Sequence, residues 1–162
     1  MFGDVVGGLP IRKGSCKFIF CSHVLEHLSL KDFHVAVNNI YEYLKRGGIL
    51  RIIVPDLEVS AKEYLSSLSC QEKAASGADN FMRKTHLGCE KSRRGILLRI
   101  REAMANSRHQ WLWDRHSLSR ALKEHGFSHV KICTYGEWSD SRCSEIEDQG
   151  RHIDSICLEA RK

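Results

Sequence analysis

The sequence predicts an α/β fold in which most strands are parallel and helices connect them. Two stretches, 17–21 and 49–54, are short, rich in aromatic and β-branched residues, and apolar on both faces, although Arg51 interrupts the second. This pattern is typical of strands that are covered on both sides. The residues between them have helical periodicity and are numerous enough for a crossover, so the two strands should be parallel with a right-handed connection.

The helix between these strands has a recognisable start and end. Ser29 and Asp32 have the spacing of a capping box, and Gly47-Gly48 is a typical stop signal. The apolar positions expected to face the core are Leu30, Phe33, Val37, Ile40, Tyr41 and Leu44. The second strand should end at Pro55-Asp56.

The rest of the chain adds an insertion, one more helix and two strands. Residues 57–108 alternate helical pieces, Val59–Leu68 and Ile96–Met104, with Ser- and Gly-containing breaks, and we interpret them as a helical cap inserted in the domain. Asp114 should cap a helix that ends at Gly126. Strands are expected at 130–135 and 153–160, joined by a polar loop over 136–150. The helix should bury Leu118, Ala121 and Leu122.

Length and composition limit the class of protein. A chain of 162 residues is expected to form one domain, here 1–162, and 42% hydrophobic with 28% charged residues excludes a wholly disordered chain. No apolar run approaches the length of a membrane span, and no secretory signal is recognisable, so we expect no membrane association and a cytoplasmic location.

The seven cysteines do not form a known framework. Their number is odd and no CxxC pair occurs, which argues against both a disulfide scaffold and a zinc ribbon. We expect Cys21, Cys133 and Cys157 to behave as small buried apolar residues within strands.

Positive charge is concentrated in one stretch. Residues 82–108 hold eight Lys and Arg against two Glu, within a chain of net charge +5. Such a stretch suits a phosphate-bearing partner, but a solvated helix face explains it more simply.

The string His23-Val24-Leu25-Glu26-His27 matches the H-x-x-E-H pattern of inverted zinc proteases. We expect no metal site here, because the string follows a buried strand directly, a helix cap is reached only at Ser29, and no third ligand is identifiable. Its position indicates another role. Ligands bind beyond the carboxyl ends of parallel strands, so residues 21–27 and Pro55-Asp56 should converge on one polar crevice.

Several motifs together resemble the class I S-adenosylmethionine-dependent methyltransferases of the type 11 group. They are Leu9-Pro10, Cys-Ser-His-Val-Leu-Glu-His-Leu from residue 21, Tyr-Leu-Lys-Arg-Gly-Gly from residue 43, Ile-Leu-Arg-Ile-Ile-Val-Pro-Asp-Leu-Glu from residue 49, and His109-Gln-Trp-Leu-Trp-Asp114. The resemblance covers most of the chain apart from parts of 57–108. It implies a partial Rossmann-like sheet, mostly parallel with an antiparallel final strand, and S-adenosylmethionine as the cofactor.

Site residues are carried over from this resemblance. It implies cofactor contacts at Asp4, Val5, Cys21, Ser22 and His23. It also implies that Glu26 and Asp56 face an unknown methyl acceptor. Where the acceptor must lose a proton, His27 or His109 is the candidate base, although a purely structural hydrogen bond is an equal alternative for both. Trp111 and Trp113 are expected to serve packing.

The chain lacks two features that the first half of this family's fold normally carries. No strand followed by a G-x-G loop is present, nor is an acidic residue at the end of a second strand, so the chain is expected to be a carboxyl-terminal part. The strand at 17–21 should then have a bare edge, which favours dimerisation or pairing with a partner methyltransferase.

Three functions therefore stay open. The first is methyl transfer, by this chain or a longer protein. The second is a silent remnant that acts as a regulatory or interaction subunit. The third is nucleic-acid binding through residues 82–108, which lack the interleaved aromatic residues that stack on bases.

Overall fold

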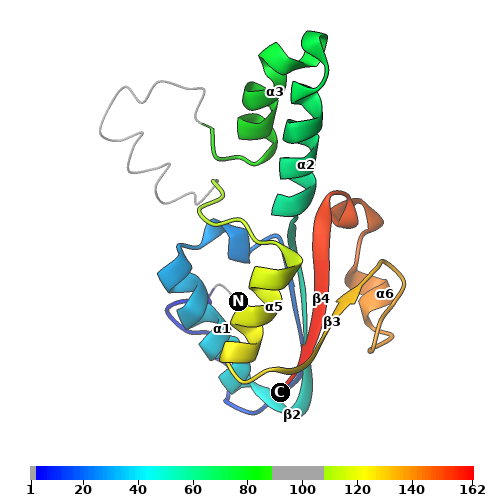
Figure 1. The fold of residues 1–162 in the computed structure, drawn as a ribbon. Helices are drawn as coiled ribbons and strands as arrows, with labels where there is room; N and C mark the ends of the chain where they lie inside the picture. Colours follow the sequence, from blue (N-terminus) through cyan, green and yellow to red (C-terminus); the bar gives the residue numbers. More distant parts are fainter. Residues whose placement is uncertain (1–2, 89–107) are drawn as a thin grey trace.

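The structure is a computed structural model, and it describes residues 3–88 and 108–162 (Figure 1). The described elements follow one another along the chain as β1 Cys16–Ser22, η1 Leu25–His27, α1 Leu30–Tyr43, β2 Leu44–Pro55, α2 Leu57–Leu68, α3 Gln71–Lys84, α5 Arg115–Glu124, β3 Ser128–Cys133, α6 Cys143–Ile146, η2 Gln149–His152 and β4 Ser155–Arg161.

Four strands form one mixed sheet in the order β1-β2-β4-β3. β1 and β2 are parallel, as predicted, and β4 is antiparallel to both of its neighbours, β2 and β3. Three strands therefore run in one direction and the last strand of the chain runs in the other. The predicted fold class, a mostly parallel sheet with an antiparallel final strand, is confirmed.

Helix α1 begins as predicted and ends earlier. The Ser29 hydroxyl accepts a hydrogen bond from the Asp32 backbone N–H at 3.1 Å, which satisfies one free donor of the first turn. The helix ends at Tyr43 instead of Gly47-Gly48, because Leu44 already pairs with Cys16 as the first residue of β2. Gly47 lies within the strand and takes a positive φ of 72°, a conformation that favours glycine.

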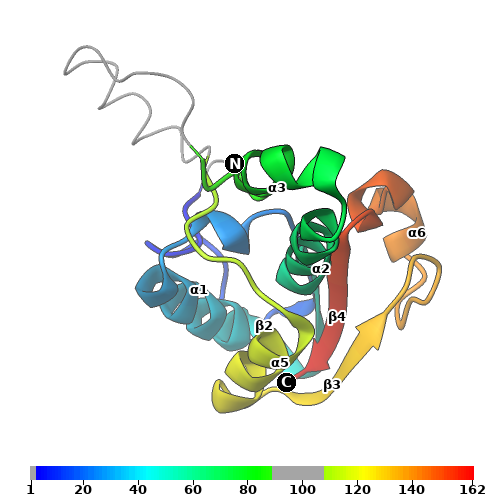
Figure 2. The ribbon, with the colours of Figure 1, turned by 45° about the horizontal axis from the view of Figure 1, so that its top comes forward.

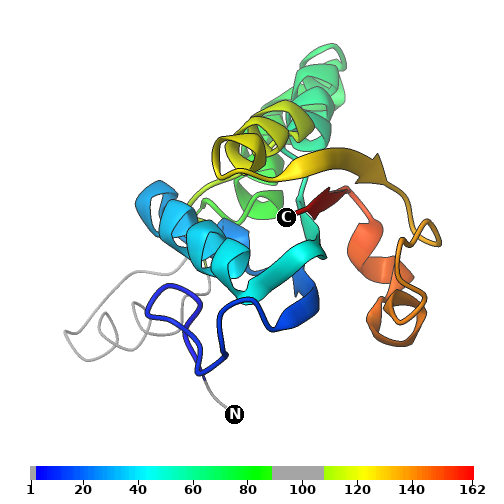
Figure 3. The ribbon, with the colours of Figure 1, turned by 90° about the horizontal axis from the view of Figure 1, so that it is seen from below.

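The main core lies between the sheet and two helices, α1 and α5, which pack on the same face (Figure 3). Alternate residues of β2 point into it, namely Leu50, Ile52 and Val54. Asp114 caps α5 and Gly126 ends it with a φ of 88°, as predicted. Leu118, Ala121 and Leu122 are buried, as expected.

The opposite face is covered by the segment that joins β3 to β4, which contains α6 and η2 (Figure 3). The sequence predicted only a polar loop over 136–150. Arg51 projects from β2 toward this segment and is fully buried. Its guanidinium donates to both carboxylate oxygens of Glu147, at 2.6 and 3.0 Å, and to Glu159 at 2.9 Å.

Helices α2 and α3 form a hairpin that projects from the end of β2 (Figure 1). Gly77 permits their close approach, because a Cβ there would lie 2.2 Å from the Ser67 hydroxyl oxygen. The described part of the predicted cap is thus helical, whereas the predicted helix Ile96–Met104 lies outside the described residues. Across the described ranges, no helix combines the length and the apolar character that crossing a membrane requires.

Cys21, Cys133 and Cys157 are buried within β1, β3 and β4, as predicted, and the six cysteines of the described ranges are free thiols.

Candidate functional site

The carboxyl ends of β1 and β2 meet, as the sequence predicted. Ser22 is paired with Ile53, and the His23 backbone N–H continues the ladder by donating to the Ile53 carbonyl at 2.8 Å. At the end of β2, Asp56 pairs with Trp113, which lies in the segment leading to α5. Residues 108–113 therefore pass over both strand ends and close the space between them.

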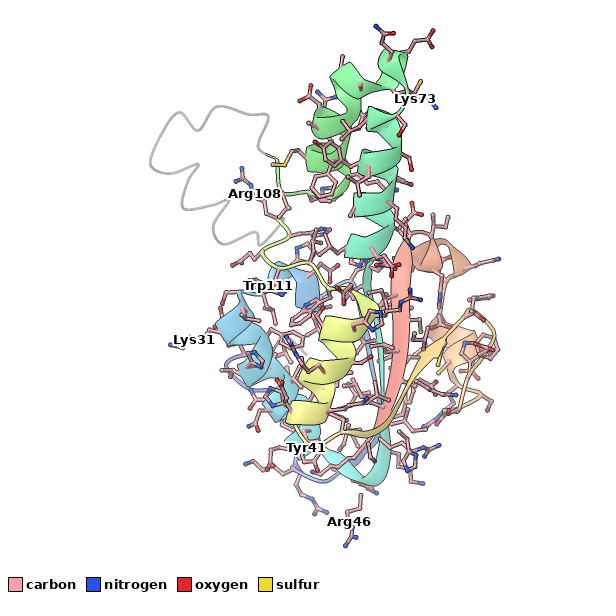
Figure 4. The ribbon with its side chains drawn as sticks, viewed as in Figure 1. Lys31, Tyr41, Arg46, Lys73, Arg108 and Trp111 are labelled. Carbon is pink, nitrogen blue, oxygen red and sulfur yellow. The ribbon has the colours of Figure 1, made fainter. Side chains whose placement is uncertain are left out.

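This crossing segment is fastened to η1 by backbone hydrogen bonds. The Glu26 carbonyl accepts from the N–H groups of Gln110 and Trp111, at 2.7 and 3.2 Å, and the Gln110 side chain donates to the His27 carbonyl at 2.8 Å. Figure 2 shows the segment running from the side of α3 down to α5, and Figure 4 shows Arg108 and Trp111 between the helical hairpin and α1. Two remote parts of the chain are held side by side as a result.

A buried carboxylate with three histidines around it lies where these parts meet. The Glu26 side chain is 1% exposed, and its Oε1 lies 3.3 Å from His23 Nδ1, 3.9 Å from His27 Nε2 and 4.0 Å from His109 Nε2. Within the described ranges, neither carboxylate oxygen has a partner in hydrogen-bond geometry. Glu26, His23, His27 and His109 are called the histidine–glutamate cluster below.

Two of the histidines are oriented by the backbone. His27 Nδ1 lies 3.1 Å from the Arg108 carbonyl oxygen, and His109 Nδ1 lies 2.9 Å from that of Thr85. A carbonyl oxygen only accepts, so each Nδ1 must carry the proton. In the neutral form of each ring, Nε2 then holds a lone pair that faces Glu26. The structural hydrogen bonds expected as an alternative role are thus present, and they leave both Nε2 atoms available.

The surroundings of the cluster shift several pKa values. Contact with the Glu26 carboxylate raises the pKa of His23, whereas burial lowers the pKa of His109. Burial, with the charge of Glu26 adding to it, raises the pKa of Cys21 to about 12. At neutral pH we therefore expect a neutral His109 and a protonated, unreactive Cys21 thiol.

The residues implied to contact the cofactor are divided by the structure. Cys21, Ser22 and His23 lie together at the end of β1, and the Ser22 hydroxyl is buried without a partner among the described residues. Asp4 and Val5 do not contact these three residues in any described interaction. The Val5 carbonyl accepts from the side chain of Asn39 in the second half of α1, at 2.9 Å, and the Asp4 carboxylate accepts from the N–H of Val6 in its own turn. No contact described for either residue reaches the cluster.

The predicted polar crevice is more closed than expected. Glu26 is fully buried, the His109 side chain is 9% exposed, and those of His23 and His27 are each 26% exposed. Asp56 is partly buried and caps α2 through a hydrogen bond from the Glu58 N–H at 2.8 Å. The crossing segment accounts for this closure, because it lies directly over the strand ends.

The H-x-x-E-H string does not form a continuous helix, as expected. His23 has a left-handed φ of 53°, and only Leu25–His27 form a short 3-10 turn. Sequence reasoning did not predict that His109 lies beside Glu26 and His27. One potential ligand atom from each of these three residues lies within 4.8 Å of the other two. Sequence reasoning also missed His86, whose ring centroid lies 4.9 Å from that of His109. No local sequence pattern predicts the contact of His109 with Glu26 and His27 or its contact with His86.

The two tryptophans differ in environment. Trp113 is buried and packs on Phe33 with ring centroids 4.2 Å apart, which confirms the expected packing role. Trp111 is 40% exposed, and its ring centroid lies 6.1 Å from that of Trp113.

Solved structures similar to this chain include several that are described as methyltransferases. The chain matches a SAM-dependent methyltransferase from Archaeoglobus fulgidus with a TM-score of 0.55 and 13% identity, covering 100% of this chain and 66% of that one. It matches PigF with SAH at a TM-score of 0.51 and 14% identity, covering 99% and 34%. A Haloferax volcanii protein described as a methyltransferase, in complex with the activator Trm112, matches at a TM-score of 0.51 and 13% identity, covering 98% and 58%.

This chain therefore spans between about one third and two thirds of the length of these proteins, and at such low identities the likeness shows the fold. A search of the curated proteins finds no match. A family profile described as "Methyltransferase domain" matches residues 8–132, which is more than half of the chain. The chain belongs to this methyltransferase-domain family.

Proposed function

We propose that this chain carries the acceptor side of an S-adenosylmethionine-dependent methyltransferase. The observation that supports this best is the histidine–glutamate cluster at the joined carboxyl ends of two parallel strands, the position where open α/β sheets bind ligands. Family membership supports the reaction class, and two similar structures are described by SAM dependence or by bound SAH.

Part of the chain fits one side of the cofactor. Ser22 has a buried hydroxyl without a partner in the described ranges, next to Cys21 and His23, and an unpaired buried hydroxyl is costly unless a ligand or water completes it. The sequence offers no G-x-G loop after a strand, and Asp4 and Val5 make no described contact with these residues. Cofactor binding by Cys21, Ser22 and His23 alone would therefore be weak.

In this proposal His27 or His109 accepts the acceptor's proton. Methyl transfer depends mainly on holding the methyl donor and the nucleophile in line, and a base is needed only when the nucleophile must lose a proton. The Nε2 lone pair of His27 or His109 would take that proton. The nearby Glu26 carboxylate would stabilise the imidazolium that forms.

The burial of Glu26 refines its assignment. A side chain that is 1% exposed cannot readily touch an acceptor, so we assign Glu26 to positioning the histidines instead of the substrate contact that the family resemblance implied. Asp56 is partly buried at the start of α2 and keeps the acceptor-facing assignment.

Calorimetric titration of the full chain with S-adenosylmethionine tests the cofactor side. We expect weak saturable binding that Ser22→Ala reduces and that Ser128→Ala, an exposed serine of β3, leaves unchanged. Equal binding by both variants would remove Ser22 from the assignment. The absence of any binding would instead favour the second candidate below.

The base assignment is tested in an active, longer relative. Replacing the residue equivalent to His27 or His109 by asparagine should lower kcat by about 10²–10⁴-fold if that side chain is the base. A kcat unchanged in both variants would refute the base role without affecting cofactor binding.

A second candidate function is that of a regulatory or completing subunit. Within the described residues β1 pairs only with β2, so one edge of β1 is unpaired, and its Phe18, Ile19 and Phe20 are partly exposed. Such an edge suits the addition of a strand from another chain. For the third function, nucleic-acid binding, most of the basic stretch lies outside the described residues.

A further inference from the structure

We propose that Glu26, His27 and His109 form a binding site for one divalent transition-metal ion, with Zn²⁺ as the ion that best suits this donor set. The sequence analysis expected no metal, because the H-x-x-E-H string offered no third ligand. The fold supplies that ligand from the crossing segment as His109. The inference concerns binding alone and does not depend on methyl transfer.

The distances are close to those of a metal centre. Zinc bound at about 2.0–2.1 Å in a tetrahedron holds its ligand atoms about 3.3 Å apart. Here Glu26 Oε1 lies 3.9 Å from His27 Nε2 and 4.0 Å from His109 Nε2, and all three ligand atoms lie within 4.8 Å of one another. Coordination would require the two distances from Glu26 Oε1 to shorten by about 0.6–0.7 Å.

The charge balance of the cluster favours a cation. Glu26 is buried, and neither of its oxygens has a hydrogen-bond partner among the described residues. His23 approaches Oε1 at 3.3 Å but does not reach Oε2 in any described contact. Burying a carboxylate charge is unfavourable unless a positive charge lies close to it. A metal ion coordinated by Glu26 supplies that positive charge.

The atoms behind the ligands have the arrangement that metal sites require. A metal-bound histidine normally donates its other ring N–H to a carbonyl or carboxylate, which fixes the tautomer and the ring orientation. His27 does this to the Arg108 carbonyl and His109 to the Thr85 carbonyl. The two hydrogen bonds that the Glu26 carbonyl accepts hold η1 against the crossing segment, so the ligands are positioned before an ion binds.

Two imidazoles and one carboxylate also indicate which ion would bind. Ca²⁺ and Mg²⁺ prefer oxygen ligands, whereas this set suits Zn²⁺ and, with open coordination positions, Fe²⁺. Three protein ligands leave a fourth position for water or for an oxygen of a bound substrate. With an ion in place the Nε2 lone pairs of His27 and His109 are used, so the base role proposed above belongs to the metal-free chain.

A second group of potential ligands in the described ranges lacks these properties. Glu147, His152 and Cys157 also lie within 4.8 Å of one another. Both carboxylate oxygens of Glu147, however, already accept hydrogen bonds from Arg51, and the guanidinium supplies the compensating charge. A cation there would be repelled, so the proposal is specific to the first group.

The experiment is a calorimetric titration of the chelator-treated full chain with ZnCl₂, repeated with Co²⁺ followed by visible absorption. We expect one ion per chain and the Co²⁺ bands of a four-coordinate nitrogen and oxygen site. His109→Asn, His27→Asn and Glu26→Gln should each weaken binding by at least about 100-fold, since losing even a supporting residue costs about 10–100-fold. His116→Asn, an exposed histidine of α5, is the matched control and should bind like the wild type.

Circular dichroism of each variant without metal identifies those that fold. If a cluster variant does not fold, the wild-type Co²⁺ spectrum and a rise in wild-type Tm with Zn²⁺ provide the test. No saturable Zn²⁺ binding by the wild type, or equal weakening by His116→Asn and His109→Asn, would overturn the proposal. Neither result bears on S-adenosylmethionine binding, which is measured separately with Ser22→Ala.

Discussion

Replacing Arg51 by methionine should destabilise the protein by about 3–5 kcal/mol, the usual cost of removing one partner from a buried ion pair. The Arg51 side chain is 0% exposed, as is that of Glu147, and that of Glu159 is 3% exposed. Methionine keeps much of the volume but leaves two buried carboxylates without the guanidinium. His152, 3.2 Å from Glu147, and Lys131, 3.5 Å from Glu159, compensate only in part.

The size of this effect is large compared with the whole stability of a domain, which is about 5–15 kcal/mol. Urea unfolding at pH 7, followed by circular dichroism, measures it as a lower transition midpoint with an unchanged slope. Arg46→Met is the matched control, because Arg46 is an exposed residue of the same strand at the lower end of the sheet (Figure 4). It should change the free energy of unfolding by no more than about 0.5 kcal/mol.

The pH dependence gives an independent check of the same reasoning. Burial alone would raise the pKa of Glu147 and Glu159, but hydrogen bonds, including those from Arg51, outweigh it and both pKa values lie below the ordinary range. In the wild type, Glu147 and Glu159 contribute to the free energy of unfolding above the pKa of an unfolded glutamate, about 4.3. This contribution is lost as the pH falls through their lower pKa values in the folded protein. Without the guanidinium, burial should raise both pKa values, so Arg51→Met should gain stability as the pH falls from 7 toward 5.

Adding Glu147→Gln to Arg51→Met should recover part of the loss, because the amide carries no charge. The reasoning would be refuted if Arg51→Met cost less than about 1 kcal/mol at pH 7 and had the pH profile of the wild type.

Three further changes test other parts of the fold. Phe33→Ala removes a fully buried ring that packs on Trp113 and should cost about 3–5 kcal/mol in urea unfolding; a loss below about 1 kcal/mol would contradict the packing. Asp114→Ala should cost about 1 kcal/mol at pH 7. Hydrogen bonds from the first turn of α5 lower the pKa of Asp114, so this difference should shrink as the pH falls below about 4, and a pH-independent difference would exclude the cap as its cause. The unpaired edge of β1 should produce dimers in size-exclusion chromatography with light scattering, which Phe18→Lys should reduce; a clean wild-type monomer would count against this interface.

Much of the fold could be predicted because the signals are local. Ser29 and Asp114 cap the helices that they were expected to start, and the apolar runs around Ile19 and Ile52 became paired parallel strands. Helix α3 was missed. Its Ser and Gly residues indicated breaks, whereas Gly77 is required for close packing on α2. Tertiary contact overrides local preference in such cases.

The site could be predicted only in part, for a related reason. The joining of the two strand ends follows from parallel topology and was expected. The contact between Glu26 and His109 depends on the path of the crossing segment, which no periodicity or spacing encodes. Likewise, the sequence marked Arg51 only as an interruption of an apolar run. Its partners lie in a segment that its composition identified merely as polar.

The position of β4 has a consequence for synthesis of the protein. β4 lies between β2 and β3, yet it follows both in the chain. While the ribosome has released only the residues before Ser155, β3 has no neighbour to pair with and the edge of β2 is open to other nascent chains. The four-stranded sheet can be completed only after β4 has emerged, so force-profile measurements on stalled ribosomes should detect its completion once residues 155–161 have left the exit tunnel.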